Sequence, residues 1–527
     1  MRSPKSSSRT SSLHDGSSSE YDDVLEAQTP YDDVETPLLA TDLPPELVPD
    51  RKFQRNIMLI SFIVIGLVET YSFLTNAPLQ EIIEDFICHN QYPDHMMNEP
   101  TIQDRRCKEP DVQKTLAMVK SWWSSTEMWV PALVQIPYGI IADKYGRRPV
   151  IFLSLFGILL EGCIAIVILL HPQTFSIWGI VATSLTYFIG GGPPMATAMV
   201  WTILCDCIPA AERTKAFYWV SALGIILSAV LNPIAAWLMG IDPWLPMWIG
   251  ILCMLLGTFA ALFIPETLRL RKEADASHHR GGSASERLLP SEEPASEAHL
   301  GPPKALVQEL FLGAKQNFQH IWRFIFASKS VALLVAALGS AYPIRLAVEG
   351  FMLQYTTKRF DWSWSKATYV FTTTKATGLV MLLLVLPIGS KLVAKKLGDN
   401  PIRRDLYLAR ISINSIALGC LFAAIAYTPP LIIVGFVFYG IGAGFVSQLR
   451  ALVTGIVEPH TLATLNTMIS SMETIMGSIG APAFGWLMSR GMELGGAWLG
   501  LPYLATTGFA ILSCILLWVF RIPRAFL

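Results

Sequence analysis

The sequence has little charge for its length and no excess of either sign. Charged residues make up 15% of its 527 residues, whereas a soluble protein carries about 25%. Lysine and arginine number 40 against 41 aspartates and glutamates, so no basic surplus is present to bind nucleic acid. The shortage of charge argues against a soluble globular protein, and the balance argues against a nucleic-acid-binding one.

Several functional motifs are also missing. No phosphate-binding loop of the Walker type is present, which argues against transport driven by ATP. The sequence shows no nucleophile–base or metal-ligand spacing, so we expect no enzyme, no metal site and no cofactor. It also has no Asn-x-Ser/Thr acceptor and no signal peptide at its N-terminus.

Long apolar blocks dominate what is present. Apolar residues make up 52% of the chain, and a helix needs roughly 20 of them in a row to cross a bilayer. Because lipid offers no partner for backbone polar groups, each span must be helical. We therefore predict an all-α polytopic membrane protein with twelve spans, with eleven as the alternative, at 57–76, 120–140, 150–170, 178–204, 217–239, 245–264, 331–354, 368–390, 406–427, 431–453, 466–488 and 501–520.

Two hydrophilic segments divide the chain. Residues 1–54 are Ser-rich and acidic and are predicted to be a disordered tail. Residues 267–328 are predicted to be a linker with an amphipathic helix near its end. The spans then fall into an N-terminal bundle of six at 55–266 and a C-terminal bundle of six at 329–527.

Basic residues collect in alternate loops. Lys144, Arg147 and Arg148 follow the second predicted span, and Lys395 and Lys396 follow the eighth. Since such residues favour the cytoplasmic side, we expect both termini and the linker to be cytoplasmic. The stretch after the first span is expected to be an acidic loop on the opposite side, with Glu81, Glu84, Asp85, Asp94, Glu99 and Asp104.

The two halves repeat one another. Pro137-Tyr138-Gly139 matches Pro387-Ile388-Gly389 at an offset of 250 residues, and the glycines at 190 and 192 match those at 440 and 442 at the same offset. Two repeated halves of six spans are a known transporter architecture, with the substrate site between them. The repeat predicts two pseudo-symmetric six-helix bundles.

The stretch PYGIIADKYGRRP places four charges between two apolar spans. Its Gly139, Asp143, Lys144, Gly146, Arg147 and Arg148 resemble the loop 2–3 signature of the major facilitator superfamily. Asp206, Pro209 and Arg213 resemble the family's loop 4–5 pattern, and PETLR from Pro265 is similar to its common end of span 6. The stretches after spans 1 and 7 are also similar to fungal members related to proton-coupled folate and haem-carrier-type transporters.

The resemblance implies two six-helix bundles that rock about a central cavity. It also implies that Asp143 stabilises the outward-facing state through a charge cluster that breaks in the other state. The alternative is that the basic residues of the motif only fix topology. Gly139 and Gly389 are expected where helices pack closely, and Gly146 where a tight turn forms.

Ionisable residues inside the predicted spans are candidates for function, because a charge at mid-bilayer costs about 3 kcal/mol or more. The proton-coupling and substrate candidates are Glu69, Glu127, Arg345, Glu349, Lys375 and Glu473, while Lys120 and Glu161 also lie in spans. For Glu161 a role in joining helices is favoured. The resemblance places spans 1 and 7 at the cavity, so Glu69 and the Arg345–Glu349 pair rank first, with Glu69 as the coupling carboxylate.

Further residues carry smaller hypotheses. Pro233 and Pro482 resemble the family's antiporter signature, although Ser228, Asn232 and Ala236 replace its glycines in span 5. Tyr71, Trp201, Tyr342, Tyr439 and Gln448 are expected to line the cavity. Cys88 and Cys107 are the cysteines placed where a disulfide can form.

The leading hypothesis is a secondary active transporter of a small organic solute, coupled to protons and directed towards efflux. It would act as a monomer in the lipid bilayer of the plasma membrane, with a vacuolar or other internal membrane as the alternative. A proton-coupled importer of a folate-like or nutrient solute is the second hypothesis. A membrane sensor that keeps the fold without transport is the third.

Overall fold

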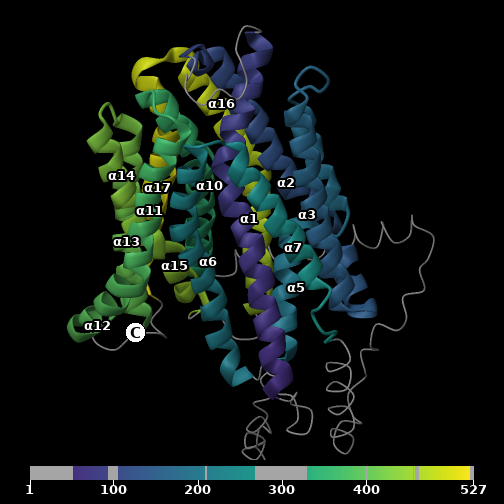
Figure 1. Cartoon of the computed structure of the whole chain (residues 1–527). Coiled ribbons are helices and arrows are strands. Elements are labelled where there is room, and N and C mark those ends of the chain that lie inside the picture. Colours follow the sequence, from purple (N-terminus) through teal and green to yellow (C-terminus); the bar gives the residue numbers. More distant parts are fainter. Residues whose placement is uncertain are drawn as a thin grey trace, which may run out of the picture. The chain divides into compact units, whose positions relative to one another are not determined.

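The computed structural model describes residues 51–92, 105–207, 210–267, 329–397, 401–454, 456 and 462–522. Residues 1–50 and 268–328, which hold most of the predicted tail and linker, lie outside the described residues. All regular secondary structure within the described ranges is helical. The helices run between two ends of the molecule, as Figure 1 shows.

The N-terminal half consists of α1 (Arg51–Gln91), η2 (Arg105–Lys108), α2 (Pro110–Tyr145), α3 (Arg147–Leu170), α4 (Gly179–Thr183), η3 (Ser184–Phe188), α5 (Gly192–Cys207), α6 (Ala210–Met239) and α7 (Trp244–Ala261). The C-terminal half consists of α10 (Lys329–Phe360), α11 (Trp364–Val380), η4 (Met381–Val385), α12 (Leu386–Leu397), α13 (Pro401–Ile425), α14 (Pro429–Ile441), η5 (Gly442–Gly444), α15 (Phe445–Thr454), α16 (Leu462–Leu494), η7 (Gly496–Gly500) and α17 (Leu501–Val519). When consecutive pieces are joined, the described residues give one helical segment for each of the twelve predicted spans.

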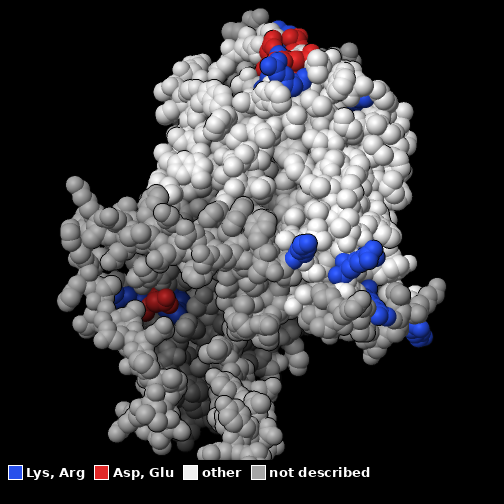
Figure 2. Space-filling view, turned by 180° about the vertical axis from the view of Figure 1, so that it is seen from behind, with Lys and Arg blue, Asp and Glu red and all other residues white. Residues whose placement is uncertain are grey.

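Eight of the described helices are long and apolar enough to cross a membrane by length and composition. The face drawn in Figure 2 agrees with this composition, because its charged side chains gather toward the two ends and leave an uncharged band between them. The segments that do not meet this criterion of length and apolar composition include α2 and α16. The first carries Lys120 and Glu127, and the second carries Glu473 and Arg490. Polar residues inside a span therefore mark helices that face other helices or a cavity.

The first helix is much longer than predicted. It has 41 residues, so the last four residues of the predicted tail are helical, and Glu81, Glu84 and Asp85 lie in helix rather than in an acidic loop. For these three acids the expectation was wrong, because Ile82, Ile83, Phe86 and Ile87 continue the helical apolar spacing and are buried. The other acids of the predicted loop, Asp94, Glu99 and Asp104, lie outside the described residues. The helix thus carries its acidic residues against the rest of the protein.

The fourth and tenth segments are both interrupted at the glycines that repeat in the sequence. Gly190 and Gly191, between η3 and α5, and Gly192, the first residue of α5, all have positive φ. Gly442 begins the short 3-10 turn η5 between α14 and α15. A Cβ at Gly190 would collide with the backbone of α3 at Leu153 and Ser154. Glycine is required there because α3 packs directly against the break.

Two helix pairs carry most of the packing between the halves: α2 against α16, and α6 against α11. We call the end with Cys88, Cys107 and Trp364 the disulfide end, and the end with Asp143 and Lys395 the Asp143 end. At mid-helix, Ser125 donates a hydrogen bond to the carbonyl of Ser478 at 2.6 Å. Towards the disulfide end, Lys120 donates one to the carbonyl of Gly350 at 2.8 Å.

At the Asp143 end, the described residues show open space where contact between the halves was expected. A Cβ added at Gly139 or at Gly389 would meet no described atom within 4 Å. The close packing expected for these two glycines is therefore absent from this conformation, which corrects the prediction. Contact at the disulfide end and open space at Gly139 and Gly389 describe a molecule that opens towards the Asp143 end.

Candidate functional site

Three adjoining cavities lie among the helices of the two halves. The largest of the three, about 370 Å³, is lined by α1, α2, α3, η3, α5 and α10 and is called here the acidic lobe. A cavity of about 330 Å³, the apolar lobe, shares Val68 and Glu69 with it. A third of about 240 Å³, the cationic lobe, shares Glu349 with the acidic lobe and Ile225 with the apolar lobe. The shared residues make these lobes parts of one site.

The acidic lobe gathers carboxylates from four helices, α1, α2, α3 and α10. Glu69, Glu127, Glu161 and Glu349 all line it, with Lys120 as a basic residue among them. Glu161 is buried and accepts hydrogen bonds from Trp123 Nε1 at 3.0 Å and from the Tyr187 hydroxyl at 2.6 Å. Glu161 thus joins α2, α3 and η3, as a polar residue linking helices does, while Tyr187 also interacts with Glu127.

Glu69 differs from the other acids of the site. It lines both the acidic and the apolar lobe, where it sits beside Trp201 and aliphatic residues. Within the described residues Glu69 makes no hydrogen bond or ion pair. A carboxylate without a partner, facing both a polar and an apolar space, is chemically available to bind a proton or a cation.

The cationic lobe holds one acid between two bases. Glu349 accepts a hydrogen bond from Lys375 at 3.1 Å, and Arg345 Nε lies 4.0 Å from its other oxygen. Arg345 also stacks over the ring of Tyr342 at 5.2 Å. The predicted Arg345–Glu349 pair is therefore present as the longer of two contacts, and Lys375 from α11 makes the shorter one.

Glu473 has a different environment from the other candidates. Arg450 of α15 donates a hydrogen bond to it at 2.8 Å, and Glu473 lines none of the three lobes. Among the aromatic candidates, Tyr71, Trp201 and Tyr439 line the lobes. Gln448 instead accepts a hydrogen bond from Ser412 at 3.0 Å inside the C-terminal half.

The charged motif at the Asp143 end is bound within its own half. Asp143 lies 3.1 Å from the guanidinium of Arg147, whose side chain is buried. Glu266, from the PETLR stretch, accepts the backbone N–H groups of Arg147 at 3.0 Å and Arg148 at 3.2 Å. This carboxylate satisfies free N–H groups at the start of α3. Gly146 has φ +118°, and the Glu266 carboxylate fills the space where its Cβ would lie.

The remaining motif residues divide between described and undescribed parts of the chain. Pro209 and the side chains of Asp206 and Arg213 lie outside the described residues. Lys144 is exposed over the ring of Tyr145. Pro233 lies inside α6 and Pro482 inside α16, so each of the antiporter-like prolines belongs to a helix that packs on the other half.

The sequence indicated the candidate ionisable residues better than it indicated the residues that pair with them. Arg450, the partner of Glu473, lies within the tenth predicted span, and its charge inside an apolar stretch is the sequence signal that marks it. At the disulfide end, Cys88 and Cys107 form a disulfide. Beside it lies a buried polar network of Glu84, Lys108 and Trp364 that no sequence motif indicated.

Comparison with known proteins identifies the family. The family model for the Major Facilitator Superfamily matches residues 110–481. The chain belongs to the major facilitator superfamily. It is thus a multi-pass integral membrane transporter rather than an enzyme.

This facilitator has relatives among fungal export proteins. It is 28% identical over 448 residues to the MFS efflux pump atnC of Emericella nidulans, with 82% of each chain covered. It is 26% identical over 432 residues to the efflux pump ustT of Aspergillus flavus, covering 80% of this chain and 79% of that one. Its fold resembles the xylose transporter XylE of E. coli in a partially occluded inward-open conformation, with a TM-score of 0.57 at 13% identity over 90% of this chain and 99% of the other.

Proposed function

We propose that this facilitator exports a small organic compound in exchange for protons, by alternating access of a central site. The observation that carries the proposal is Glu69, an unpartnered carboxylate at the junction of the acidic and apolar lobes. A proton carrier must be reachable by water from each side in turn, and it must be free to change its protonation state. Of the acids lining the lobes, Glu161 and Glu349 are held by strong donors, so Glu69 is better placed for that role.

The cavity chemistry supports an organic cargo with an apolar body and polar groups. The apolar lobe offers aliphatic walls with Trp201, whereas the two other lobes offer charges and tyrosine hydroxyls. Organic ligands are generally held by apolar walls with a few polar anchors. Two relatives named as efflux pumps and the prolines at 233 and 482 support export over import.

We infer that the Asp143 end faces the cytoplasm and that the plasma membrane holds the protein. Basic residues such as Lys144, Arg148 and Lys395 at that end fit the cytoplasmic side. The Cys88–Cys107 disulfide at the other end fits an oxidising compartment. Because one chain supplies both halves around the site, a monomer is sufficient for transport.

Proton flux in inside-out membrane vesicles tests the proposal. The vesicles come from a host without its own efflux pumps and are acidified inside, with a pH-sensitive dye reporting the gradient. A panel of fungal natural products and drug-like compounds is added one at a time. We expect at least one compound to dissipate the gradient when the wild-type protein is present and not in empty vesicles.

The variant Glu69→Gln then tests the carboxylate. We expect it to reduce proton flux at least about tenfold, which corresponds to about 1.4 kcal/mol, while exchange of labelled for unlabelled compound continues. Glu473→Gln is the matched control, since it removes the same charge outside the three lobes and should leave the flux within about twofold. Equal loss in both variants would reject Glu69 as the carrier, and coupling of the opposite sign would indicate an importer. Absence of flux with every compound would favour the sensor.

A further inference from the structure

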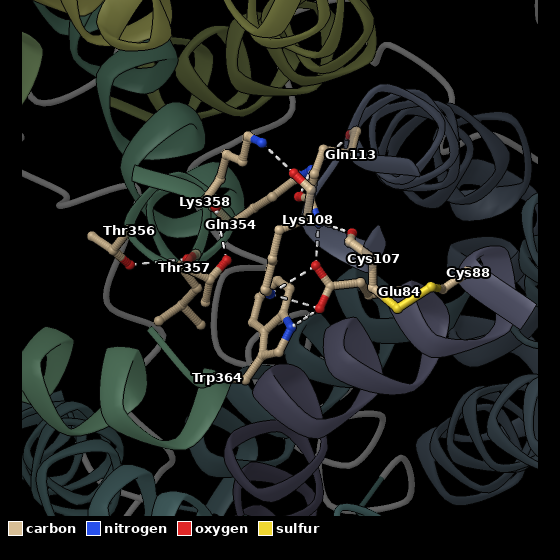
Figure 3. A network of polar contacts seen from close by, with 11 residues as sticks. Glu84, Cys88, Cys107, Lys108, Gln113, Gln354, Thr356, Thr357, Lys358 and Trp364 are labelled. Atoms are coloured by element: carbon tan, nitrogen blue, oxygen red, sulfur yellow. Dashed lines mark hydrogen bonds and ion pairs between the residues drawn. A yellow bond between two sulfur atoms is a disulfide. The ribbon is translucent and has the colours of Figure 1, made fainter. Parts of the chain in front are cut away.

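A buried network closes the disulfide end across the two halves, as Figure 3 shows. The carboxylate of Glu84 in α1 accepts hydrogen bonds from Lys108 Nζ at 2.7 and 2.8 Å and from Trp364 Nε1 at 2.7 Å. Gln113 of α2 donates a further bond to it. Since the side chains of Glu84 and Lys108 are only 8% and 9% exposed, water can do little to screen this ion pair.

Three hydrogen bonds of this network cross between the halves with the same polarity. Trp364 donates to Glu84, Gln354 donates to the carbonyl of Gln113 at 2.8 Å, and Lys358 donates to the carbonyl of Lys108. In each case the donor belongs to the C-terminal half and the acceptor to the N-terminal half. Lys108 also lies over the ring of Trp364, 5.1 Å from its centroid.

Lys108 therefore acts in three ways at once. Its ammonium neutralises Glu84, which would otherwise be a costly unpaired charge in a buried site. Its carbonyl accepts the bond from Lys358, and its side chain packs on Trp364. Without Lys108 the N-terminal half would present an uncompensated carboxylate to Trp364.

The disulfide sets the position of Lys108. Cys88 follows Glu84 by four residues on α1, so both lie on the same face one turn apart. Cys107 directly precedes Lys108 in the short helix η2. A bond between Cys88 and Cys107 consequently brings Lys108 over Glu84, and Gln113 secures the turn by donating to the carbonyl of Cys107 at 3.0 Å.

We propose that the Cys88–Cys107 disulfide fixes Lys108 over Glu84, and that Lys108 so placed is the positioning residue that holds the transporter closed at its disulfide end. Transport requires this end to open, which separates Trp364, Gln354 and Lys358 from their acceptors while the Glu84–Lys108 pair stays with the N-terminal half. Lys108 thus sets the balance between the two conformations. The inference depends on alternating access but on neither the cargo nor the coupling ion.

Hydrogen–deuterium exchange of the full chain in lipid nanodiscs, without any added compound, tests this role. Two sets of peptides are compared: 105–113 and 358–366 at the disulfide end, and 142–150 at the Asp143 end. We expect Lys108→Met to speed exchange about fivefold or more at the disulfide end and to slow it at the Asp143 end. Opposite changes at the two ends indicate a shifted conformation, whereas faster exchange at both ends, or no change, would overturn the proposal.

Two further variants separate position from charge. Lys108→Arg keeps the charge and should restore exchange at both ends to within about twofold of the wild type. Lys114→Met is the matched control, because Lys114 also joins the halves at this end, through Glu493 at 3.3 Å, but that pair is partly exposed. Exchange in the Lys114→Met variant should differ from that of the wild type by less than about twofold. If Lys114→Met changed exchange as much as Lys108→Met does, the proposal would be overturned.

The disulfide is tested by combination. Cys88→Ser with Cys107→Ser should shift exchange in the same direction as Lys108→Met. If the disulfide acts through Lys108, adding Lys108→Met to the double variant produces no larger shift than Lys108→Met alone. If the combined variant instead multiplied the changes in exchange rate of the two separate variants, the disulfide and Lys108 would act independently, and the proposal would be overturned. Intrinsic tryptophan fluorescence on heating confirms that each variant is folded before exchange is measured.

Discussion

At the scale of single residues, the ionisable groups inside the spans differ in the partners that hold them. Glu69 and the Arg345–Glu349 pair do line cavities, and a charge in an apolar stretch is enough to single them out. The partner of Glu349 is Lys375, on another helix, and that of Glu473 is Arg450. Such contacts depend on how helices pack, so the sequence separates a paired acid from a free one only when both partners share a helix face.

The partners of Glu349 predict an order of stability among variants. Glu349→Gln leaves Arg345 and Lys375 facing one another without an acid between them, whereas Lys375→Gln leaves the Arg345–Glu349 pair. We expect Glu349→Gln to be less stable than Lys375→Gln by about 1 kcal/mol, a modest value because water in the cavity screens these charges.

Unfolding of the purified protein in a denaturing detergent series, followed by tryptophan fluorescence, measures this difference. Glu493→Gln serves as the control. Hydrogen bonds from Arg490 and then Lys114 hold the pKa of the Glu493 carboxyl below its usual value, but the group is exposed, so its removal should change stability little. Equal stability of Glu349→Gln and Lys375→Gln would show that Arg345 alone does not hold Glu349.

At the scale of helices, the number and order of the segments follow from the sequence, and their lengths do not. Twelve apolar blocks predict twelve segments because each must satisfy its backbone internally. Hydropathy ends the first block near residue 76, although the helix continues to Gln91 because its apolar face is buried by neighbouring helices. Repeated glycines in the sequence indicate where a helix is interrupted, as at Gly190. They do not indicate in which conformation of the transporter a glycine is closely packed.

Gly485 lies at the contact between α2 and α16, and its position predicts the effect of a larger side chain there. A Cβ at Gly485 of α16 would overlap Ser121 of α2 and lie 3.1 Å from the carbonyl of Ala117. We expect Gly485→Val to push these helices apart and to lower the free energy of unfolding by about 1–3 kcal/mol, as overpacking does. The same unfolding series in detergent measures the loss.

Gly139→Val is the control for this prediction. Gly139 also lies in α2, but a Cβ there meets no described atom within 4 Å, so stability in this conformation should be unchanged. If Gly139 instead packs in the conformation closed at the Asp143 end, the control variant stays folded and loses transport. A destabilised Gly139→Val would contradict the open space that separates the halves at this end.

At the scale of the whole molecule, two independent features support the proposed orientation in the membrane. Basic loops and the disulfide lie at opposite ends of the helices, and each is expected on a different side. The halves are also joined near the disulfide and apart near Gly139, so the conformation opens towards the side with the basic loops. The family could be recognised from the Asp143 motif, whereas the conformation required the structure.

Glycosylation tests the orientation with single substitutions. Pro100→Thr turns Asn98-Glu99-Pro100 into an acceptor between α1 and η2, and Gln319→Thr does the same at Asn317 in the stretch before α10. We expect a gel shift, reversed by endoglycosidase, for Pro100→Thr only. A shift confined to Gln319→Thr would invert the assigned topology.

The shared polarity of the three crossing hydrogen bonds at the disulfide end also has a consequence for synthesis. The N-terminal half leaves the ribosome before the C-terminal half. With the disulfide formed, Glu84, Lys108 and Gln113 can be assembled as a surface of acceptors before Gln354, Lys358 and Trp364 have been translated. The acceptors for the second half can therefore be in place before it is made, so the loop proposed to hold one state of the finished transporter also prepares the surface onto which the second half packs.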